Sequence, residues 1–263
     1  MIYGVDVASW QAENFALLVD GKSVDFAIIK ATEGAIYINP KLPAQRDYAR
    51  SNGLVVGYYH FARPGNLWQQ ADRFLATAQP APGETLWLDW EDDAVTCAQK
   101  DQFIRYLKQK APQARVGLYC NLDYWINHDT TGYSGDALWI AHHDVAPGSP
   151  GIETEWVIHQ YSDVGIDHNI ANFFTRQAMD NWAKGLIVES TPLDVIAQVL
   201  NLLGHLIELL AVQLRTCEQV EQARHDVLKE GVDQLRAAVA TLISDDAVVA
   251  RKVVDELARR LES

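Results

Sequence analysis

Aromatic residues disappear from the last third of this 263-residue chain, and that change divides the sequence into two unlike parts. Seven of the 8 Trp and all 10 Tyr lie before residue 162, and the last aromatic residue is Trp182. From Leu186 onward the chain consists mainly of Leu, Val, Ala, Glu and Arg, a composition typical of long helices. We therefore predict a globular domain over residues 1–185, a linker over 186–191 and a helical C-terminal domain over 192–263.

The first part alternates short apolar runs with longer amphipathic stretches. Nearly continuous apolar runs are expected for strands of a parallel sheet that is covered on both faces. They lie at residues 2–7, 26–31, 55–61, 86–91, 116–120, 138–141 and 156–161, with a weaker eighth near 165–170, and helical periodicity occupies 42–51, 68–79 and 100–110. This order predicts an α/β fold, an irregular TIM-like β/α barrel of about eight strands. Because such barrels usually need about 200 residues or more, we expect some late helices to be missing.

The second part has the apolar spacing of a coiled coil. Eight apolar residues from Leu193 to Cys217 recur at alternating intervals of three and four, the a/d pattern of an interhelical seam. The pattern weakens further on, where Glu221, Arg224 and Gly231 fall on a/d positions. Two or three helices fit this sequence best, packed within one chain or associating between chains. The regular first seam favours a homo-oligomer formed through the C-terminal helices.

Charge and hydropathy exclude several classes of partner. Lys and Arg total 22 against 35 Asp and Glu, a formal net charge of −13, so no nucleic acid is expected. No apolar run approaches the roughly 20 residues that span a bilayer, so no membrane insertion is expected. The N-terminus has neither the basic nor the apolar segment of a secretory signal. Cys97, Cys120 and Cys217 show no metal-type spacing and an odd count, which fits synthesis in a reducing compartment.

The fourth predicted strand carries two carboxylates at its C-terminal end. Strand side chains alternate between faces, so Trp87, Asp89 and Glu91 share one face, at the end of the strand where barrel active sites lie. Two neighbouring carboxylates in a Trp-lined site do not readily both ionise, so one pKa should be raised. A proton donor beside a charged carboxylate is what cleavage of a glycosidic bond requires. The alternative is a solvated acidic loop, because Asp92 and Asp93 follow directly.

Polar and aromatic groups also stand at the ends of the other predicted strands. Asp6 ends the first strand, where it either caps the next segment or joins Asp89 and Glu91 at one barrel mouth. Aromatic faces with a few hydrogen-bonding groups suit a sugar, which has apolar ring faces and a rim of hydroxyls. The candidate substrate-binding residues are Trp10, Glu33, Tyr58, His60, Tyr119, Asn121, Trp139, Gln160 and Tyr161. We predict neither a cofactor nor a metal, because adjacent His142 and His143 would face opposite sides of a strand.

Five motifs follow one another along the first part. They are residues 4–11 (GVDVASWQ), 26–34 (FAIIKATEG), 56–64 (VGYYHFARP), 87–91 (WLDWE) and 159–161 (HQY). With these motifs, residues 1 to about 184 resemble the glycoside hydrolase family 25 lysozymes, the Chalaropsis-type muramidases common among phage endolysins. The resemblance implies an irregular β/α barrel that hydrolyses the β-1,4 bond between N-acetylmuramic acid and N-acetylglucosamine.

The same resemblance implies roles for four acids. Glu91 matches the family's proton donor, and Asp89 matches the partner carboxylate, which stabilises the charged intermediate or orients the substrate's acetamido group. Asp6 matches the acid at the end of the first strand. Asp167 matches a late aspartate, although His168 follows it where the family usually has an apolar residue. Assistance by the acetamido carbonyl is the favoured route, and inverting or double-displacement routes stay open.

Two other functions compete with this interpretation. A chitinase-like barrel would carry a longer acidic signature, and Trp87 occupies its expected middle acidic position here. A non-catalytic polysaccharide-binding barrel would keep the aromatic residues and lose one of the acids. All the strand-end acids are present, which favours catalysis.

The resemblance and the missing signal segment imply a phage endolysin. Such a protein would be made in the cytoplasm of the bacterial host and would act on the cell wall after release, with peptidoglycan as its partner. The tail would then either bind the wall or join copies of the catalytic domain. Residues 186–263 have no aromatic residue on which a sugar could stack, and 8 Lys and Arg against 13 Asp and Glu. We therefore favour self-association, which would raise avidity for the wall.

Overall fold

The computed structural model describes residues 1–186 and residue 229. The chain divides into two units, Met1–Glu189 and Ser190–Ser263, so the described residues cover nearly all of the first unit. The predicted linker over 186–191 and the predicted helical domain over 192–263 lie outside the described residues, apart from Leu186 and Lys229. Both stay predictions, as does the coiled coil.

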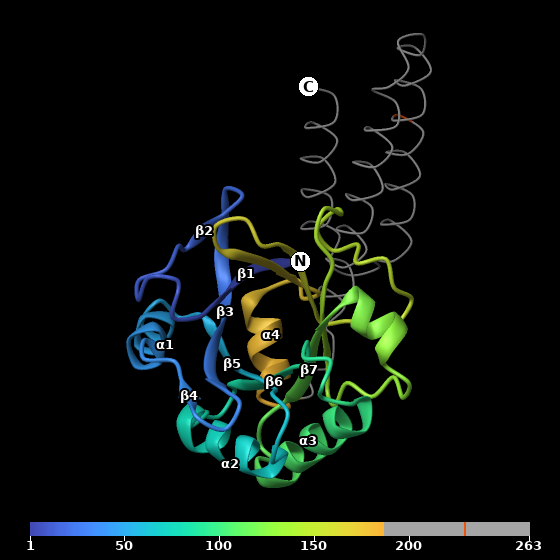
Figure 1. The fold of residues 1–263 in the computed structure, drawn as a ribbon. Helices are drawn as coiled ribbons and strands as arrows, with labels where there is room; N and C mark the ends of the chain where they lie inside the picture. The colour runs from blue at the N-terminus through green and yellow to red at the C-terminus, as the bar shows by residue number, and fades with distance from the viewer. Residues whose placement is uncertain (187–228, 230–263) are drawn as a thin grey trace. The chain divides into compact units, whose positions relative to one another are not determined.

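Eight strands form the wall of a barrel (Figure 1). They are β1 (Ile2–Val7), β3 (Lys22–Glu33), β5 (Val55–Phe61), β6 (Thr85–Asp89), β7 (Val116–Asn121), β8 (Leu138–Ala141), β9 (Ile158–Ser162) and β10 (Asp167–Ala171). Each strand pairs with the next in this order, and β1 pairs with both β3 and β10, which closes the barrel. Two short strands, β2 (Leu18–Val19) and β4 (Tyr37–Ile38), form hairpins with β3. The predicted eight-stranded barrel is confirmed.

One strand departs from the parallel arrangement. Among the eight strands of the wall, neighbours from β1 through β9 are parallel, whereas β10 runs antiparallel to both β9 and β1. Only four residues, 163–166, separate β9 from β10. A parallel crossover needs a dozen residues or more, so a connection this short reverses the chain.

Helices cover mainly the first half of the barrel. The predicted helices are α1 (Leu42–Ser51), α2 (Leu67–Ala78) and α3 (Cys97–Lys110), which pack outside β3, β5, β6 and β7 (Figure 1). Between β7 and β10 the described chain contains a single five-residue π-helix, η1 (Tyr124–His128), so the late helices are missing as expected. None of the described helices is long and apolar enough to cross a bilayer.

A further helix, α4 (Arg176–Ala183), follows the barrel and covers the end where strands begin. Its buried Met179 and Ala183 belong to the core inside the barrel. The guanidinium of Arg176 lies 2.9 Å from an oxygen of Asp25, at the start of β3, and donates to the carbonyl of Gly53, just before β5, at 3.1 Å. The opposite end of the barrel, where the strands finish, stays open.

The outer face of the strands packs against the helices. Leu86, Leu88 and Trp90 alternate onto this face and join Phe74 of α2 and Phe103 of α3 in one core. Burial of such side chains stabilises the fold by roughly 1.5–3 kcal/mol each. The sequence predicted this alternation for the strand that ends in Asp89, and the structure has the same register.

Large aromatic rings fill the inside of the barrel. Trp87 packs edge-on against Trp139, with ring centroids 5.8 Å apart. Gly117 on the next strand leaves room for the indole of Trp87, because a Cβ at that position would overlap it. Asp89 stands two residues further along β6, so its carboxylate lies above this aromatic floor, at the open end.

Candidate active site

A pocket of about 380 Å³ opens at the carboxyl ends of the barrel strands. Five carboxylates line it, namely Asp6 of β1, Asp89 and Glu91 at the end of β6, Asp163 before β10 and Asp167 in it. The other lining residues are Ala8, Trp10, Gln11, Lys30, Tyr59, Phe61, Tyr119, Trp139, His143 and Gln160. The four acids predicted from the motifs therefore meet in one pocket.

Asp89 presents a buried oxygen without a protein donor. Its residue surface is 5% exposed. The backbone here is fixed on both sides, because Asp89 O accepts the Ala62 N–H at 2.9 Å and the Trp90 N–H donates to Tyr119 O at 2.9 Å. Among the described residues, none donates a hydrogen bond to Oδ1 of Asp89. Burial and then the charge of Glu91 raise the pKa of Asp89 well above its ordinary value.

Glu91 lies two residues beyond β6, where the loop to α3 begins. Its Oε1 accepts a hydrogen bond from Asn121 Nδ2 at 3.3 Å, and its carbonyl accepts one from the Tyr124 hydroxyl at 2.7 Å. Burial raises the pKa of Glu91, although the Asn121 amide and the charge of His143 act to lower it. A raised pKa keeps this carboxyl protonated to higher pH, which is the state that a proton donor needs.

Two oriented amides hold Asp6. Its Oδ2 accepts hydrogen bonds from Gln160 Nε2 at 2.8 Å and from Asn169 Nδ2 at 2.7 Å. Tyr119 donates to the carbonyl oxygen of the Gln160 amide at 3.0 Å, and Trp139 donates to that of Asn169 at 2.8 Å. Because these donors fix which end of each amide is the oxygen, both NH₂ groups must turn toward Asp6.

Asp167 faces Asp6 across the β1–β10 pair, where the two are register partners. Burial and then the charge of Asp167 raise the pKa of Asp6 well above its ordinary value, and burial also raises the pKa of Asp167. Because ionisation of one buried acid disfavours ionisation of a neighbouring one, the two acids influence each other's titration. His168, the departure from the family pattern, has its ring Nδ1 3.4 Å from an oxygen of Asp20 and is not a lining residue.

Aromatic rings and one lysine surround the acids. Trp10 is 90% exposed at the rim, so its indole is available to a ligand. Lys30 Nζ lies 5.8 Å from the ring centroid of Tyr59 and 5.1 Å from that of Phe61, and it pairs with Glu33 at 2.6 Å. Rings beside carboxylates offer a sugar apolar contact and hydrogen bonds in the same pocket.

Two predicted substrate-binding residues, Tyr58 and His60, lie on the other face of β5 and do not line the pocket. The buried Tyr58 hydroxyl donates to Glu84 at 2.9 Å. The buried His60 ring lies between Thr32 at 2.8 Å and Gln70 at 3.0 Å, and burial lowers its pKa to about 4. Since strand side chains alternate, the pocket receives the intervening residues instead.

Those intervening residues, Tyr59 and Phe61, are ones that the prediction omitted. The sequence of the same strand does indicate that these two side chains point into the barrel, because Gly57 lies on their face. A Cβ at Gly57 would crowd the side chains of Thr85 and Trp87, so the glycine marks the face that looks into the barrel. The omitted Lys30, Gln11, His143 and Asp163 also line the pocket.

The remaining predicted binding residues divide into two groups. Those that line the pocket are Trp10, Tyr119, Trp139 and Gln160. Glu33, Asn121 and Tyr161 lie outside the lining. Glu33 pairs with Lys30, and Asn121 contacts the Glu91 carboxylate. The Tyr161 hydroxyl donates to Asp20 at 2.7 Å, since its side chain alternates away from that of Gln160.

The two adjacent histidines contact different groups. His142 Nδ1 lies 2.8 Å from the carbonyl oxygen of Pro150, and His143 Nε2 lies 3.0 Å from Oε1 of Gln160. Among the described residues, no three His, Cys, Asp or Glu side chains are grouped as a metal site.

Comparisons with known proteins place these features in a family. Residues 5–170 match the model for glycosyl hydrolases family 25. The chain is 31% identical over 199 residues to an autolytic lysozyme from Clostridium acetobutylicum, covering 72% of this chain and 58% of that protein, less than two thirds of its length. It is 31% identical over 208 residues to Lysozyme M1 from Streptomyces globisporus, covering 71% and 70% of the two chains.

A solved structure supports the fold independently. The catalytic domain of an endolysin from a Listeria monocytogenes bacteriophage superposes with a TM-score of 0.58 at 22% identity, covering 70% of this chain and 98% of that one. The matched segment, 5–170, is more than half of the chain and contains all five acids of the pocket. The chain therefore belongs to glycosyl hydrolases family 25, the lysozyme family that its motifs resemble.

Proposed function

We propose that this chain hydrolyses the β-1,4 bond between N-acetylmuramic acid and N-acetylglucosamine in bacterial peptidoglycan. The observation that carries the proposal is the pair formed by Asp89, the last residue of β6, and Glu91, two residues beyond it. Glu91 has a raised pKa that suits a proton donor, and Asp89, which also lines the pocket, has a buried oxygen, Oδ1, to which none of the described residues donates. Membership in a family whose relatives include lysozymes supports the substrate class.

Glu91 protonates the oxygen of the leaving sugar. Its carboxyl is protonated at the start of the cycle, and the proton moves to the glycosidic oxygen as the bond to the anomeric carbon breaks. The carboxylate that remains then takes a proton from the attacking water. Burial favours the neutral acid before the step, which increases the fraction of enzyme ready to react.

Asp89 orients the acetamido group of the substrate. The acetamido N–H donates to the carboxylate of Asp89, which directs the acetamido carbonyl oxygen to the anomeric carbon. That oxygen forms a bond to the carbon as the leaving group departs, and water later opens the cyclic intermediate. An ionised Asp89 stabilises the positive charge that develops on the ring, and that positive charge in turn favours ionisation of Asp89 against the effect of burial.

Asp6 and Asp167 set the charge at the mouth of the pocket. A negative charge on either acid adds to the stabilisation of a cationic transition state. The amides of Gln160 and Asn169 keep Asp6 in place. Trp10 and Tyr59 supply apolar surface for the rings of neighbouring sugars.

The test is mass spectrometry of digested peptidoglycan. Muropeptides that end in reducing N-acetylmuramic acid are the expected product. A reducing N-acetylglucosamine end, or cleavage confined to the peptide, would reject the proposal.

The biological setting that we propose is phage lysis of a bacterial host, because lysozymes of this type are common among phage endolysins. The protein would be made in the host cytoplasm and would reach the wall after release. Expression in a bacterium with and without a separate membrane pore tests this. Lysis only when the pore is present is expected, and lysis without it would contradict the proposed route.

For residues 192–263 we propose self-association through the predicted seam between Leu193 and Cys217. Linked catalytic domains would bind the wall at several points. Light scattering on the full chain and on residues 1–185 tests this, with an oligomer expected only for the full chain. A monomeric full chain whose isolated tail binds cell walls would support the competing wall-binding function.

A further inference from the structure

Glu91 directly follows the last residue of the β6 segment that makes a hydrogen bond to the neighbouring strand. The last such bond after β6 is made by Trp90, whose N–H donates to the Tyr119 carbonyl. Glu91 belongs to the loop that follows, which runs to Thr96, the N-cap of α3. A proton donor must lie at hydrogen-bond distance from the leaving oxygen, and a misplacement of about 1 Å can cost roughly 100-fold in rate, so other groups must fix this loop.

Tyr124 contacts Glu91 by two routes. Its hydroxyl lies 2.7 Å from the carbonyl oxygen of Glu91, which fixes the backbone. Its backbone N–H donates to Oδ1 of Asn121 at 2.9 Å, and Nδ2 of the same amide donates to Oε1 of Glu91 at 3.3 Å. Because the N–H identifies the oxygen end of the Asn121 amide, the NH₂ end must face the carboxylate.

The Tyr124 hydroxyl also contacts the loop further on. It lies 2.5 Å from Oδ1 of Asp93, two residues after Glu91. A hydroxyl has one proton, so the two acceptors share it, and both belong to the same short loop. Both polar contacts of the Tyr124 hydroxyl are therefore with the segment that carries Glu91.

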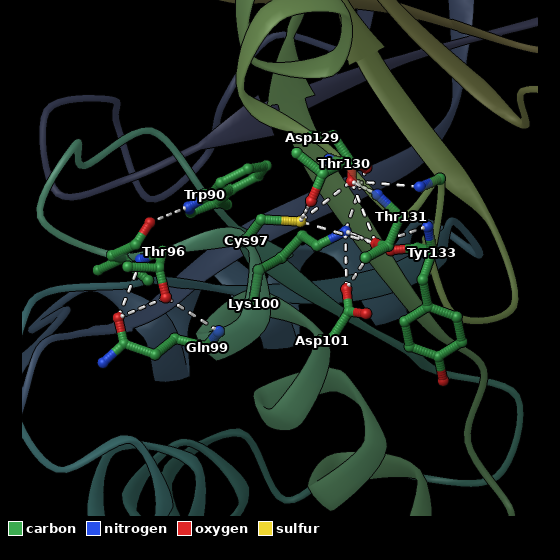
Figure 2. A network of polar contacts seen from close by, with 12 residues as sticks. Trp90, Thr96, Cys97, Gln99, Lys100, Asp101, Asp129, Thr130, Thr131 and Tyr133 are labelled. Atoms are coloured by element: carbon green, nitrogen blue, oxygen red, sulfur yellow. Dashed lines mark hydrogen bonds and ion pairs between the residues drawn. The ribbon is translucent and has the colours of Figure 1, made fainter.

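The phenol ring is itself rigidly placed. Tyr124 begins the π-helix η1, and π-helical turns occur often at functional sites. Its ring packs edge-on against Trp90, with centroids 5.2 Å apart, and stacks on His128 at 4.5 Å. Trp90 is itself fixed by two contacts (Figure 2). Its indole N–H donates to the Val95 carbonyl at 2.6 Å, and Lys100 Nζ lies 5.5 Å from its ring centroid.

We propose that Tyr124 is a positioning residue for proton transfer by Glu91, acting through the Glu91 carbonyl and through Asn121. This inference rests on the proposed hydrolase function. Ring packing alone would need only a phenylalanine. The hydroxyl adds two hydrogen bonds, and both are directed at the loop of the proton donor.

The test is Tyr124→Phe, which keeps the ring and the backbone N–H and removes only the hydroxyl. Tyr106→Phe is the matched control, because the Tyr106 hydroxyl makes a 2.8 Å hydrogen bond to Asp72 between α2 and α3. Rates of release of reducing ends from peptidoglycan are measured over a range of pH. We expect kcat about tenfold lower for Tyr124→Phe with KM nearly unchanged, and no change for Tyr106→Phe.

The pH profile separates positioning from general weakening of the fold. Burial is the main cause of the raised pKa of Glu91, so a loosened loop that admits water should lower it. The alkaline limb of kcat should then move to lower pH in Tyr124→Phe. An unchanged profile and rate, equal to those of Tyr106→Phe, would overturn the inference while leaving the hydrolase function intact. Wild-type protein that releases no reducing ends would overturn both.

Asn121→Ala is a second variant that tests the other route. The Asn121 amide lowers the pKa of Glu91, so its removal should move the alkaline limb to higher pH, opposite to the shift in Tyr124→Phe. Opposite shifts support the inference, even if Tyr124→Phe gives less folded protein. Shifts in the same direction, or none in Asn121→Ala, overturn it.

Discussion

Two clusters of buried carboxylates in this barrel differ in what surrounds them. Beside α3, Asp129 accepts hydrogen bonds from the Thr131 N–H at 2.8 Å, the Cys97 thiol at 3.2 Å and Lys100 at 3.1 Å (Figure 2). Burial acts to raise its pKa, but these donors outweigh burial and lower it. In the pocket, Asp89 is equally inaccessible, its Oδ1 has no donor among the described residues, and its pKa is raised.

The difference shows which cluster serves stability and which serves the ligand. A buried charge with all its hydrogen bonds made contributes to the folded state, whereas an unpaired one costs free energy until a ligand supplies the partner. Natural proteins retain such a cost mainly where it has a function. We therefore expect substitutions in the two clusters to separate activity from stability.

The largest effect is expected for Glu91→Gln. The amide keeps the size of the side chain and cannot protonate the leaving oxygen, so activity should fall by roughly 100- to 10,000-fold. Turnover of peptidoglycan by reducing-end release measures this, and circular dichroism checks the fold. Glu155→Gln, at an exposed position outside the pocket, is the control and should keep full activity. Near-native turnover of Glu91→Gln would contradict the assigned role.

Asp89→Asn should lower activity almost as much, by about 100-fold or more, because it removes the negative charge beside the reacting sugar. The same substitution should increase the stability of the folded protein while it lowers activity. The folded pKa of Asp89 is raised, so the wild type loses stability as pH rises from the unfolded value, near 3.8, through the folded one. The variant should therefore melt at a higher temperature than wild type at pH 7 and at the same temperature at pH 3. A lower Tm for the variant than for wild type at pH 7 would contradict the conclusion that Asp89, unlike Asp129, lowers the stability of the fold.

The sequence predicted the barrel and the faces of β6 well, because Leu and Trp alternate with acids there in a plain period of two. It also placed β5 at residues 55–61, but it chose the outer face of that strand for ligand contact, where Tyr58, Tyr59, His60 and Phe61 succeed one another. Every position in that run is aromatic, so alternation alone does not identify the inner face. Only the preceding Gly57 identifies the inner face, because a side chain there would collide with Thr85 and Trp87 inside the barrel.

The amide network around Asp6 was beyond sequence reasoning for a different reason. Asn169 and Gln160 lie more than 150 residues from Asp6 along the chain. They meet Asp6 because β10 reverses direction and pairs with β1, a closure that local patterns do not specify. Asp167 could be found through the family motif, whereas its pairing with Asp6 depends on that strand register.

Asp129→Asn tests the stabilising cluster. Loss of the charge beside Lys100, whose side chain is fully buried, should cost about 1.5–3 kcal/mol of the free energy of unfolding at pH 7. The folded pKa of Asp129 is lowered, so its contribution is present above the unfolded pKa, near 3.8, and is lost as pH falls through the folded value. Denaturant unfolding at pH 7 and pH 3 measures this, and the difference from wild type should shrink at the lower pH. Activity per folded molecule should stay within about threefold of wild type, and a loss as large as that of Asp89→Asn would remove the distinction between the clusters.

Asp167→Asn should have the mildest effect on activity, about a tenfold decrease, because Asp167 acts on the charge of the pocket at a distance from the bond that breaks. The charge of Asp167 is the second cause of the raised pKa of Asp6, after burial, so the variant should lower the pKa of Asp6 and favour its ionised form. Ionisation of Asp6 replaces the negative charge that Asp167 loses, which is why most of the rate should survive. Asp47→Asn on the exposed face of α1 removes the same charge elsewhere and should leave the rate unchanged. A loss equal to that of Glu91→Gln would show that Asp167 takes part in bond cleavage directly and that charge sharing with Asp6 is not its role.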